Sequence, residues 1–113
     1  MNVSMAWGGC YLEHREYFDA MATSMQAAGH KVGILTGERE SKKPQILGSL
    51  GFTPDFMILW GEFEVIVGGA QLKAQKMIDN QIGMHFDPDG TEMKRWTDLW
   101  IVKTLDSGQK AKF

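Results

Sequence analysis

The residues of this chain best suited to chemistry are Thr36 and Gly37, which directly follow the apolar run 32–35. A hydroxyl and exposed backbone amides at such a junction can hold a phosphate. Small or polar residues also follow three other apolar runs: Trp7-Gly8-Gly9, Trp60-Gly61-Glu62 and Asp87-Pro88-Asp89-Gly90. We therefore expect a ligand site built from the residues that come immediately after strands.

The elements that must position these residues alternate between short apolar runs and helical patterns, which is typical of βαβ units and a mostly parallel sheet. The sequence predicts five strands, at 3–7, 32–36, 55–60, 83–86 and 99–105, and a short extended piece at 63–67. It predicts helices at 17–28, 44–50 and 70–80. Right-handed crossovers bring the carboxyl ends of parallel strands to one edge of the sheet, where open α/β folds bind their ligands.

Length and composition favour one ordinary domain: 113 residues, 43% hydrophobic and 23% charged, with a net charge of −2. We expect a three-layer, Rossmann-like α/β domain over 1–105 and a flexible tail at 106–113. Cys10 is the single cysteine, no apolar run approaches the ~20 residues of a membrane span, and the start lacks a basic signal-peptide region. These features favour a cytoplasmic location. Mixed, slightly acidic charge argues against nucleic-acid binding.

Three segments resemble motifs of the haloacid-dehalogenase-like (HAD) phosphohydrolase superfamily: Ile34-Leu35-Thr36-Gly37-Glu38-Arg39, Lys73 and Phe86-Asp87-Pro88-Asp89-Gly90. They match its second, third and fourth motifs in order, and the resemblance covers about residues 1–105. It implies that Thr36 binds phosphoryl oxygen and that Lys73 neutralises the charge of phosphate and nucleophile. It also implies that Asp87 and Asp89 hold magnesium.

The first motif departs from the family, which has Asp-x-Asp-Gly-Thr where this chain has Met5-Ala6-Trp7-Gly8-Gly9. The family uses one aspartate to attack phosphorus and the other as acid and base. A thioether cannot form an acyl phosphate, and an indole cannot transfer a proton at neutral pH. The amides of Gly8 and Gly9 remain available to phosphate. Magnesium would be held weakly, because two of its usual carboxylate ligands are replaced.

Each candidate also has an ordinary structural interpretation. Thr36 suits a turn, Lys73 suits a solvated helix face, and the run 87–90 has the composition of a turn or helix cap. Tryptophans usually pack in cores. The three histidines lack metal-ligand spacing, and Cys10 has no evident histidine partner for nucleophilic chemistry.

Two functions of different classes follow. The first is a capless, HAD-like pseudoenzyme that binds a small phosphorylated ligand with weak or no phosphatase turnover. The alternative is a non-enzymatic module in which Trp7 and Trp60 present an apolar patch to a protein partner or to another copy of the chain. Catalysis by displaced acidic residues, such as Glu13, Glu62 or Glu64, is a third possibility. The short segments between strands leave no room for a cap domain, so we expect an open crevice.

Overall fold

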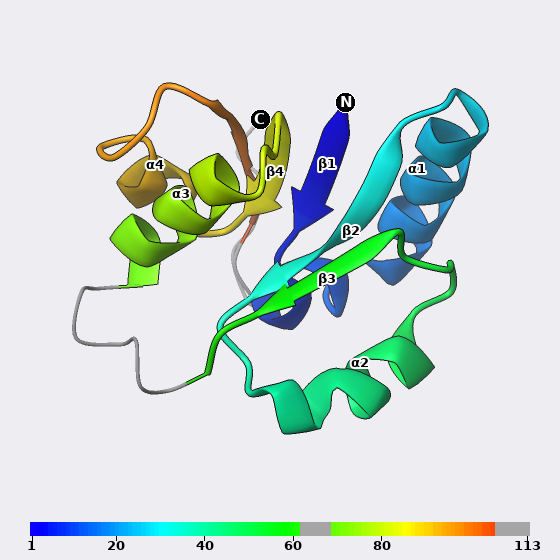
Figure 1. Ribbon diagram of the computed structural model, residues 1–113. Coiled ribbons are helices and arrows are strands. Elements are labelled where there is room, and N and C mark those ends of the chain that lie inside the picture. The colour runs from blue at the N-terminus through cyan, green and yellow to red at the C-terminus, as the bar shows by residue number, and fades with distance from the viewer. Residues whose placement is uncertain (62–68, 106–113) are drawn as a thin grey trace.

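The computed structural model describes residues 1–61 and 69–105, which form a five-stranded sheet with helices on both faces (Figure 1). The strands are β1 (Asn2–Met5), β2 (Lys31–Thr36), β3 (Phe56–Leu59), β4 (Met84–Asp87) and β5 (Trp100–Lys103). The longer helices are α1 (Arg15–Ala27), α2 (Lys43–Ser49) and α3 (Gly69–Asp79), and the short ones are η1 (Trp7–Tyr11), η2 (Glu40–Lys42) and α4 (Gly90–Met93). No helix among these is long and apolar enough to span a membrane.

All neighbouring strands are parallel, and their order is β3-β2-β1-β4-β5. The expected Rossmann-like α/β fold with a five-strand parallel sheet is therefore confirmed. The chain proceeds outward from β1 to β3 and then crosses to the other side of β1 to form β4 and β5. The strand order thus reverses between β1 and β4, and such a switch point is where open parallel sheets form a ligand crevice.

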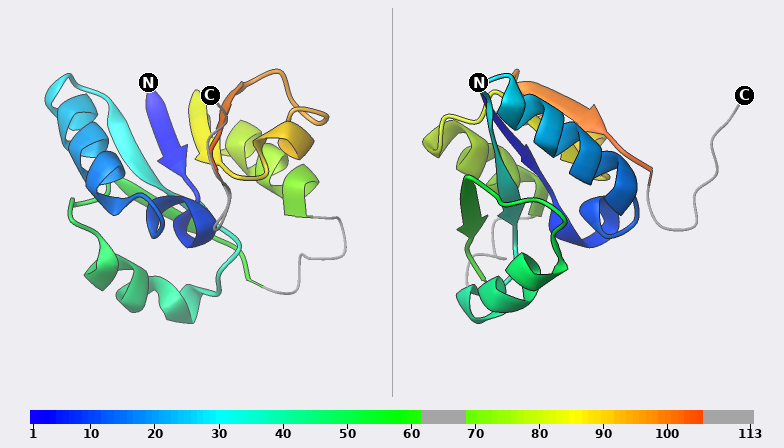
Figure 2. Two further views of the ribbon diagram at one scale, coloured as in Figure 1. Left: turned by 180° about the vertical axis from the view of Figure 1, so that it is seen from behind. Right: turned by 90° about the vertical axis from the view of Figure 1, so that its right-hand side faces the viewer.

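Helices cover both faces of the sheet, so the molecule has three layers (Figure 2). An apolar core lies on each side of the sheet. Residues of α1 and α2 pack on one face, with Phe18 and Ile46 fully buried. Residues of α3 and α4 pack on the other face, with Met77 and Met93 fully buried. Because both faces are covered, the central strands are apolar along most of their length, as β2 illustrates.

Side-chain alternation divides β1 and β4 between these two faces. Met5 of β1 and Phe86 of β4 belong to the core on the α1 side. Ser4, His85 and Asp87 point to the opposite face, beneath α3, and all three are fully buried. Fully buried polar groups require hydrogen-bond partners inside the fold.

Apart from element ends that differ by a residue or two and the unexpected short turn η2, the observed elements differ from the expected ones in the first strand and in α4. The first strand ends at Met5, because Trp7–Tyr11 turn into η1, where Gly9 has a positive φ of 72°. Helix α4 was not expected, since four residues are too few to show a helical period. The expected extended piece at 63–67 and the expected tail at 106–113 lie outside the described residues.

Candidate functional site

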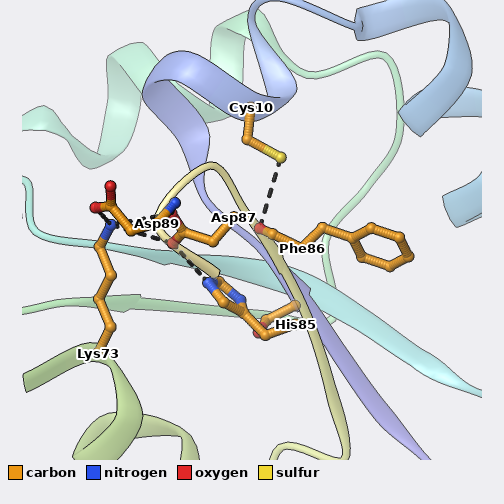
Figure 3. Close-up of polar contacts among 7 residues, drawn as sticks. Cys10, Lys73, His85, Phe86, Asp87 and Asp89 are labelled. Atoms are coloured by element: carbon orange, nitrogen blue, oxygen red, sulfur yellow. Dashed lines mark hydrogen bonds and ion pairs between the residues drawn. The ribbon is translucent and has the colours of Figure 1, made fainter. Parts of the chain in front are cut away.

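Lys73, Asp87 and Asp89 form an ion-pair cluster at the carboxyl end of β4 (Figure 3). Lys73 extends from α3, and its Nζ lies 3.1 Å from Asp87 Oδ2, 3.2 Å from Asp87 Oδ1 and 2.8 Å from Asp89 Oδ2. The side chains are exposed by 17%, 0% and 56%, respectively. The structure therefore brings together three of the candidate residues, with Asp87 as the fixed member and Asp89 at the surface.

A buried chain of hydrogen bonds through His85 and Ser4 fixes the position of Asp87. His85 Nε2 lies 2.9 Å from Asp87 Oδ2, and His85 Nδ1 lies 2.7 Å from Ser4 Oγ. Because an ionised carboxylate only accepts hydrogen bonds, Nε2 donates to Asp87, and in the tautomer with its proton on Nε2 alone, Nδ1 accepts from the Ser4 hydroxyl. The amide of Asp89 donates to Asp87 Oδ1 at 2.9 Å. Asp87 is thus held on several sides.

In this cluster, interactions among the charged groups affect the pKa values of Lys73 and Asp87 more strongly than burial does. Burial by itself lowers the pKa of Lys73, but the charges of Asp87 and Asp89 reverse this effect and leave that pKa above its usual value. Burial by itself raises the pKa of Asp87, but the hydrogen bond from His85 and the charge of Lys73 leave that pKa below its usual value. Lys73 and Asp87 are therefore both ionised at neutral pH.

The loop after β1 lies against the loop after β4. The amide of Ala6 donates to the Phe86 carbonyl oxygen at 3.0 Å, and a Cβ on Gly9 would lie 3.6 Å from Pro88 Cγ. Gly8 is exposed and Gly9 is half-buried. Of the two glycines expected to offer amides to phosphate, Gly9 therefore lies beside Pro88 in the loop that follows β4.

The first-motif residues Met5 and Trp7 have structural surroundings. Met5 is fully buried in the core on the α1 side. Trp7 is 9% exposed, and its Nε1 donates to Ser49 Oγ at 2.9 Å, which ties η1 to the end of α2. Because Trp7 is buried, it cannot contribute to the apolar surface patch expected of an interaction module.

Thr36 is the last residue of β2 and Gly37 follows it; β2 lies on the other side of β1 from β4. Thr36 lies two residues after Ile34 in β2 and so points to the same face, the α1 side, whereas Asp87 points to the α3 side. Within the described residues, Thr36 makes neither an ion pair nor a hydrogen bond with the cluster around Lys73. Thr36 thus shares the edge of the sheet with Asp87 but not its face.

Cys10 in η1 is buried, and its Sγ donates to the Phe86 carbonyl oxygen at 3.5 Å (Figure 3). Burial raises the pKa of this thiol to about 12, and the negative charge of Asp87 acts in the same direction. At neutral pH the group is therefore a protonated thiol, which is a poor nucleophile and a poor metal ligand.

The magnesium implied by the HAD resemblance is a poor fit to these residues. Magnesium requires near-octahedral oxygen coordination, and no group of three or more His, Cys, Asp and Glu in the described part of the chain could hold a metal. Both oxygens of Asp87 already accept hydrogen bonds, and Asp89 is paired with Lys73. The two carboxylates alone would make a weak site.

A separate hollow of about 440 Å³ lies on the α1 side of the sheet. Its lining includes Phe18 of α1, Phe86 of β4 and Val102 of β5. It is mostly apolar and does not include Lys73 or Asp87. The charged groups most suited to chemistry therefore lie on the opposite face of β4 from this hollow.

Two residues of the buried network were missed from the sequence, namely Ser4 and His85. In β4 the apolar Met84 and Phe86 alternate with His85 and Asp87, and this alternation is visible in the sequence. It indicates that both polar side chains share a face and need partners. Ser4 lies directly opposite His85 across the β1–β4 pair. This partnership could not be predicted from the sequence, because it depends on β4 lying beside β1.

When the chain is compared with protein-family models, with curated proteins and with solved structures, nothing matches.

Proposed function

We propose that this chain is a HAD-like phosphohydrolase-fold protein that binds a small phosphorylated ligand and has little or no phosphatase turnover. The observation that carries the proposal is the Lys73 ammonium, held between Asp87 and Asp89 at the β1–β4 switch point. Lysine is a common phosphate-binding residue, and the crevice at a switch point is the usual ligand position in open parallel sheets.

Phosphate reaches Lys73 in this proposal by replacing Asp89. Asp87 is fully buried and fixed, whereas the side chain of Asp89 is 56% exposed and can turn into water at small cost. Displacement of the Asp89 carboxylate removes the main electrostatic repulsion between the site and the phosphate. The amides of Gly8 and Gly9 complete the site from the neighbouring loop. Thr36 and Gly37 would contact only a ligand that extends across the end of β1.

The weak turnover in the proposal follows from the groups at the first motif. The fully buried thioether of Met5 offers no attacking oxygen, and the indole of Trp7 is engaged with Ser49. Asp87 is a poor substitute as a nucleophile, because it is fully buried and both of its oxygens accept hydrogen bonds. Glu62 and Glu64 lie outside the described residues, and Glu13 is exposed before α1.

The test is the affinity for inorganic phosphate, measured by calorimetry. Lys73→Met should weaken binding about tenfold or more, since a charge-assisted contact is lost. Asp89→Asn should strengthen binding, because the internal competitor loses its charge. Lys31→Met is the matched control, because exposed Lys31 begins β2 at the opposite edge of the sheet. Wild-type chain without measurable phosphate binding, or with equal affinity in Lys73→Met, would refute the proposal.

Phosphatase turnover provides a second measurement. With p-nitrophenyl phosphate, we expect the wild-type rate to equal the background rate of Lys73→Met. Restoring the aspartates at Met5 and Trp7 is a less direct test, because Met5→Asp would place an unpaired carboxylate in the apolar core and destabilise the fold. Turnover well above background in the wild-type chain would contradict the assignment as a pseudoenzyme.

A second candidate function, a module for self-assembly or for binding a protein partner, is favoured by a different surface. Trp96 and Trp100 are 51% and 59% exposed, and Trp100 begins the edge strand β5. Exposed tryptophans are enriched at protein interfaces. This surface, and not one formed by the buried Trp7, is where such a partner would bind.

A further inference from the structure

The Lys73 ammonium occupies the position that a bridging cation would take between Asp87 and Asp89 (Figure 3). One nitrogen lies within 3.2 Å of both Asp87 oxygens and within 2.8 Å of Asp89 Oδ2. Asp87 is fully buried, so its charge needs a partner inside the fold. Lys73, with a side chain only 17% exposed, provides that partner.

The hydrogen-bonding capacity of Asp87 is filled by these contacts. A carboxylate has about four lone-pair sites. At Oδ1 they are used by the Asp89 amide and Lys73, and at Oδ2 by His85 and Lys73. A metal ion could bind Asp87 only by displacing Lys73, because the other donors belong to the backbone and to a fully buried ring.

The remaining acidic group, Asp89, cannot make up for this. Its Oδ2 faces the same ammonium at 2.8 Å, so a divalent ion at this place would meet a fixed positive charge. Like charges at such short separation repel strongly in a partly buried site, where water screens them poorly. The expected magnesium ligands are thus already neutralised by a group of the chain itself.

We propose that Lys73 is the resident cation of this site and replaces a divalent metal, so that ligand binding at the β1–β4 edge is independent of magnesium. The proposal concerns the same residues as the proposed phosphate site. It departs from the magnesium dependence that the HAD resemblance implies. A ligand here meets one ammonium and one releasable carboxylate in place of a hydrated metal ion.

The experiment uses Mn²⁺ as the metal probe, because it prefers the same oxygen ligands as Mg²⁺ and its binding is read directly by electron paramagnetic resonance. Wild-type chain should bind Mn²⁺ more weakly than about 1 mM. Lys73→Met leaves Asp87 and Asp89 free of the ammonium and should gain at least tenfold in Mn²⁺ affinity. Lys73→Arg keeps the cation and should show no gain. Asp89→Asn added to Lys73→Met should remove the gain.

The outcomes separate clearly. Wild-type binding of Mn²⁺ at micromolar concentration, or a folded Lys73→Met variant without a gain, would overturn the proposal. Circular dichroism reports whether each variant is folded. If Lys73→Met does not fold, the wild-type measurements decide: Mn²⁺ affinity, and phosphate affinity in EDTA against 5 mM Mg²⁺. Equal phosphate affinity supports the proposal, and an increase with Mg²⁺ refutes it.

The two proposals fail in different ways. Absence of phosphate binding would refute the proposed function, while the Mn²⁺ titrations would still show whether Lys73 excludes a metal. Tight Mn²⁺ binding would refute the role of Lys73 as resident cation, while phosphate binding could still be present.

Discussion

Burial makes the thiol of Cys10 unreactive, and this gives a prediction for a single residue. With a pKa of about 12 in place of 9.0, the native thiol carries roughly a thousandfold less thiolate at pH 8. Labelling by a disulfide reagent such as DTNB should therefore be at least about a thousandfold slower in the native chain than in guanidinium. Cys10→Ser provides the blank. Rapid labelling of the folded chain would show that Cys10 is accessible and ionised.

Asp87 gives a prediction about stability and pH. Its folded pKa is lowered, so its contribution to stability is present above the unfolded pKa of about 3.9 and is lost as pH falls through the folded pKa. Lys73 has a raised pKa, so its contribution is present below about 10.4 and is lost as pH rises through the folded pKa. The cluster should therefore stabilise the fold most strongly from about pH 5 to pH 9.

The measurement is urea unfolding of Asp87→Asn at two pH values. At pH 7 the substitution should cost about 3 kcal/mol, because it removes a buried charge from hydrogen-bonded partners. Toward pH 2 the difference from wild type should shrink, since the stability contributed by the ionised carboxylate is lost progressively as pH falls below the unfolded pKa. Asp98→Asn, at an exposed position, is the control. An equal loss at both pH values would exclude an ionic role for Asp87.

At this scale the sequence selected Asp87 and Asp89 by their position after a strand and all three residues, Lys73 included, by motif order; the structure brings the three together, and their roles stay predictions. The sequence was insufficient for Ser4 and His85. Their pairing depends on β4 lying beside β1, and local patterns contain no information about which distant strand becomes a neighbour. The sequence likewise did not predict that Thr36 and Asp87 point to opposite faces of the sheet, because this depends on the strand register.

Among the secondary-structure elements, the close packing of β2 against β3 gives a third prediction. A Cβ at Gly33 would overlap the carbonyl oxygen of Phe56, and a backbone atom cannot move aside cheaply. Gly33→Ala should cost at least about 3 kcal/mol or prevent folding. Thermal unfolding measured by circular dichroism provides the readout.

Gly48→Ala in α2 is the matched control. A Cβ there meets nothing within 4 Å, and alanine favours a helix over glycine by about 1 kcal/mol. This variant should be as stable as wild type or more so. If Gly33→Ala were equally harmless, the β2–β3 pairing described here would be wrong.

Five strands and the three longer helices were predictable, because each has either a compact apolar run or a helical period. Gly29, with a φ of 94°, ends α1 as expected of a glycine after a helix. The short elements η1 and α4 were not predictable. The apolar run 3–7 is equally compatible with a longer strand, but its end forms a local hydrogen-bonded turn that begins η1.

For the whole molecule, the exposed Trp96, which follows α4, and the exposed Trp100, which begins β5, lead to a fourth prediction. Among the described residues β5 pairs only with β4, so its outer edge offers free backbone groups beside Trp100. If this surface joins two copies, light scattering after size exclusion should show mass rising with concentration. Trp100→Lys should abolish that rise. Tyr17→Lys, at an equally exposed aromatic on α1, should leave it unchanged.

A mass that equals one chain at every concentration up to about 1 mM would exclude self-assembly through this surface. The second candidate function would then be limited to a different protein as partner. The phosphate-site proposal does not depend on this outcome, because Trp100 and Lys73 lie on separate parts of the fold.

The position of β1 at the centre of the sheet bears on how the chain is made. β1 is synthesised before the other four strands, and β2 can pair with it early, but its second neighbour is β4, about eighty residues later. Until residues 84–87 emerge from the ribosome, β1 has a bare side and Ser4 lacks its partner. Nascent chains that stop before β4 should therefore be prone to aggregation and need a chaperone, since an unpaired, apolar strand edge recruits other strands.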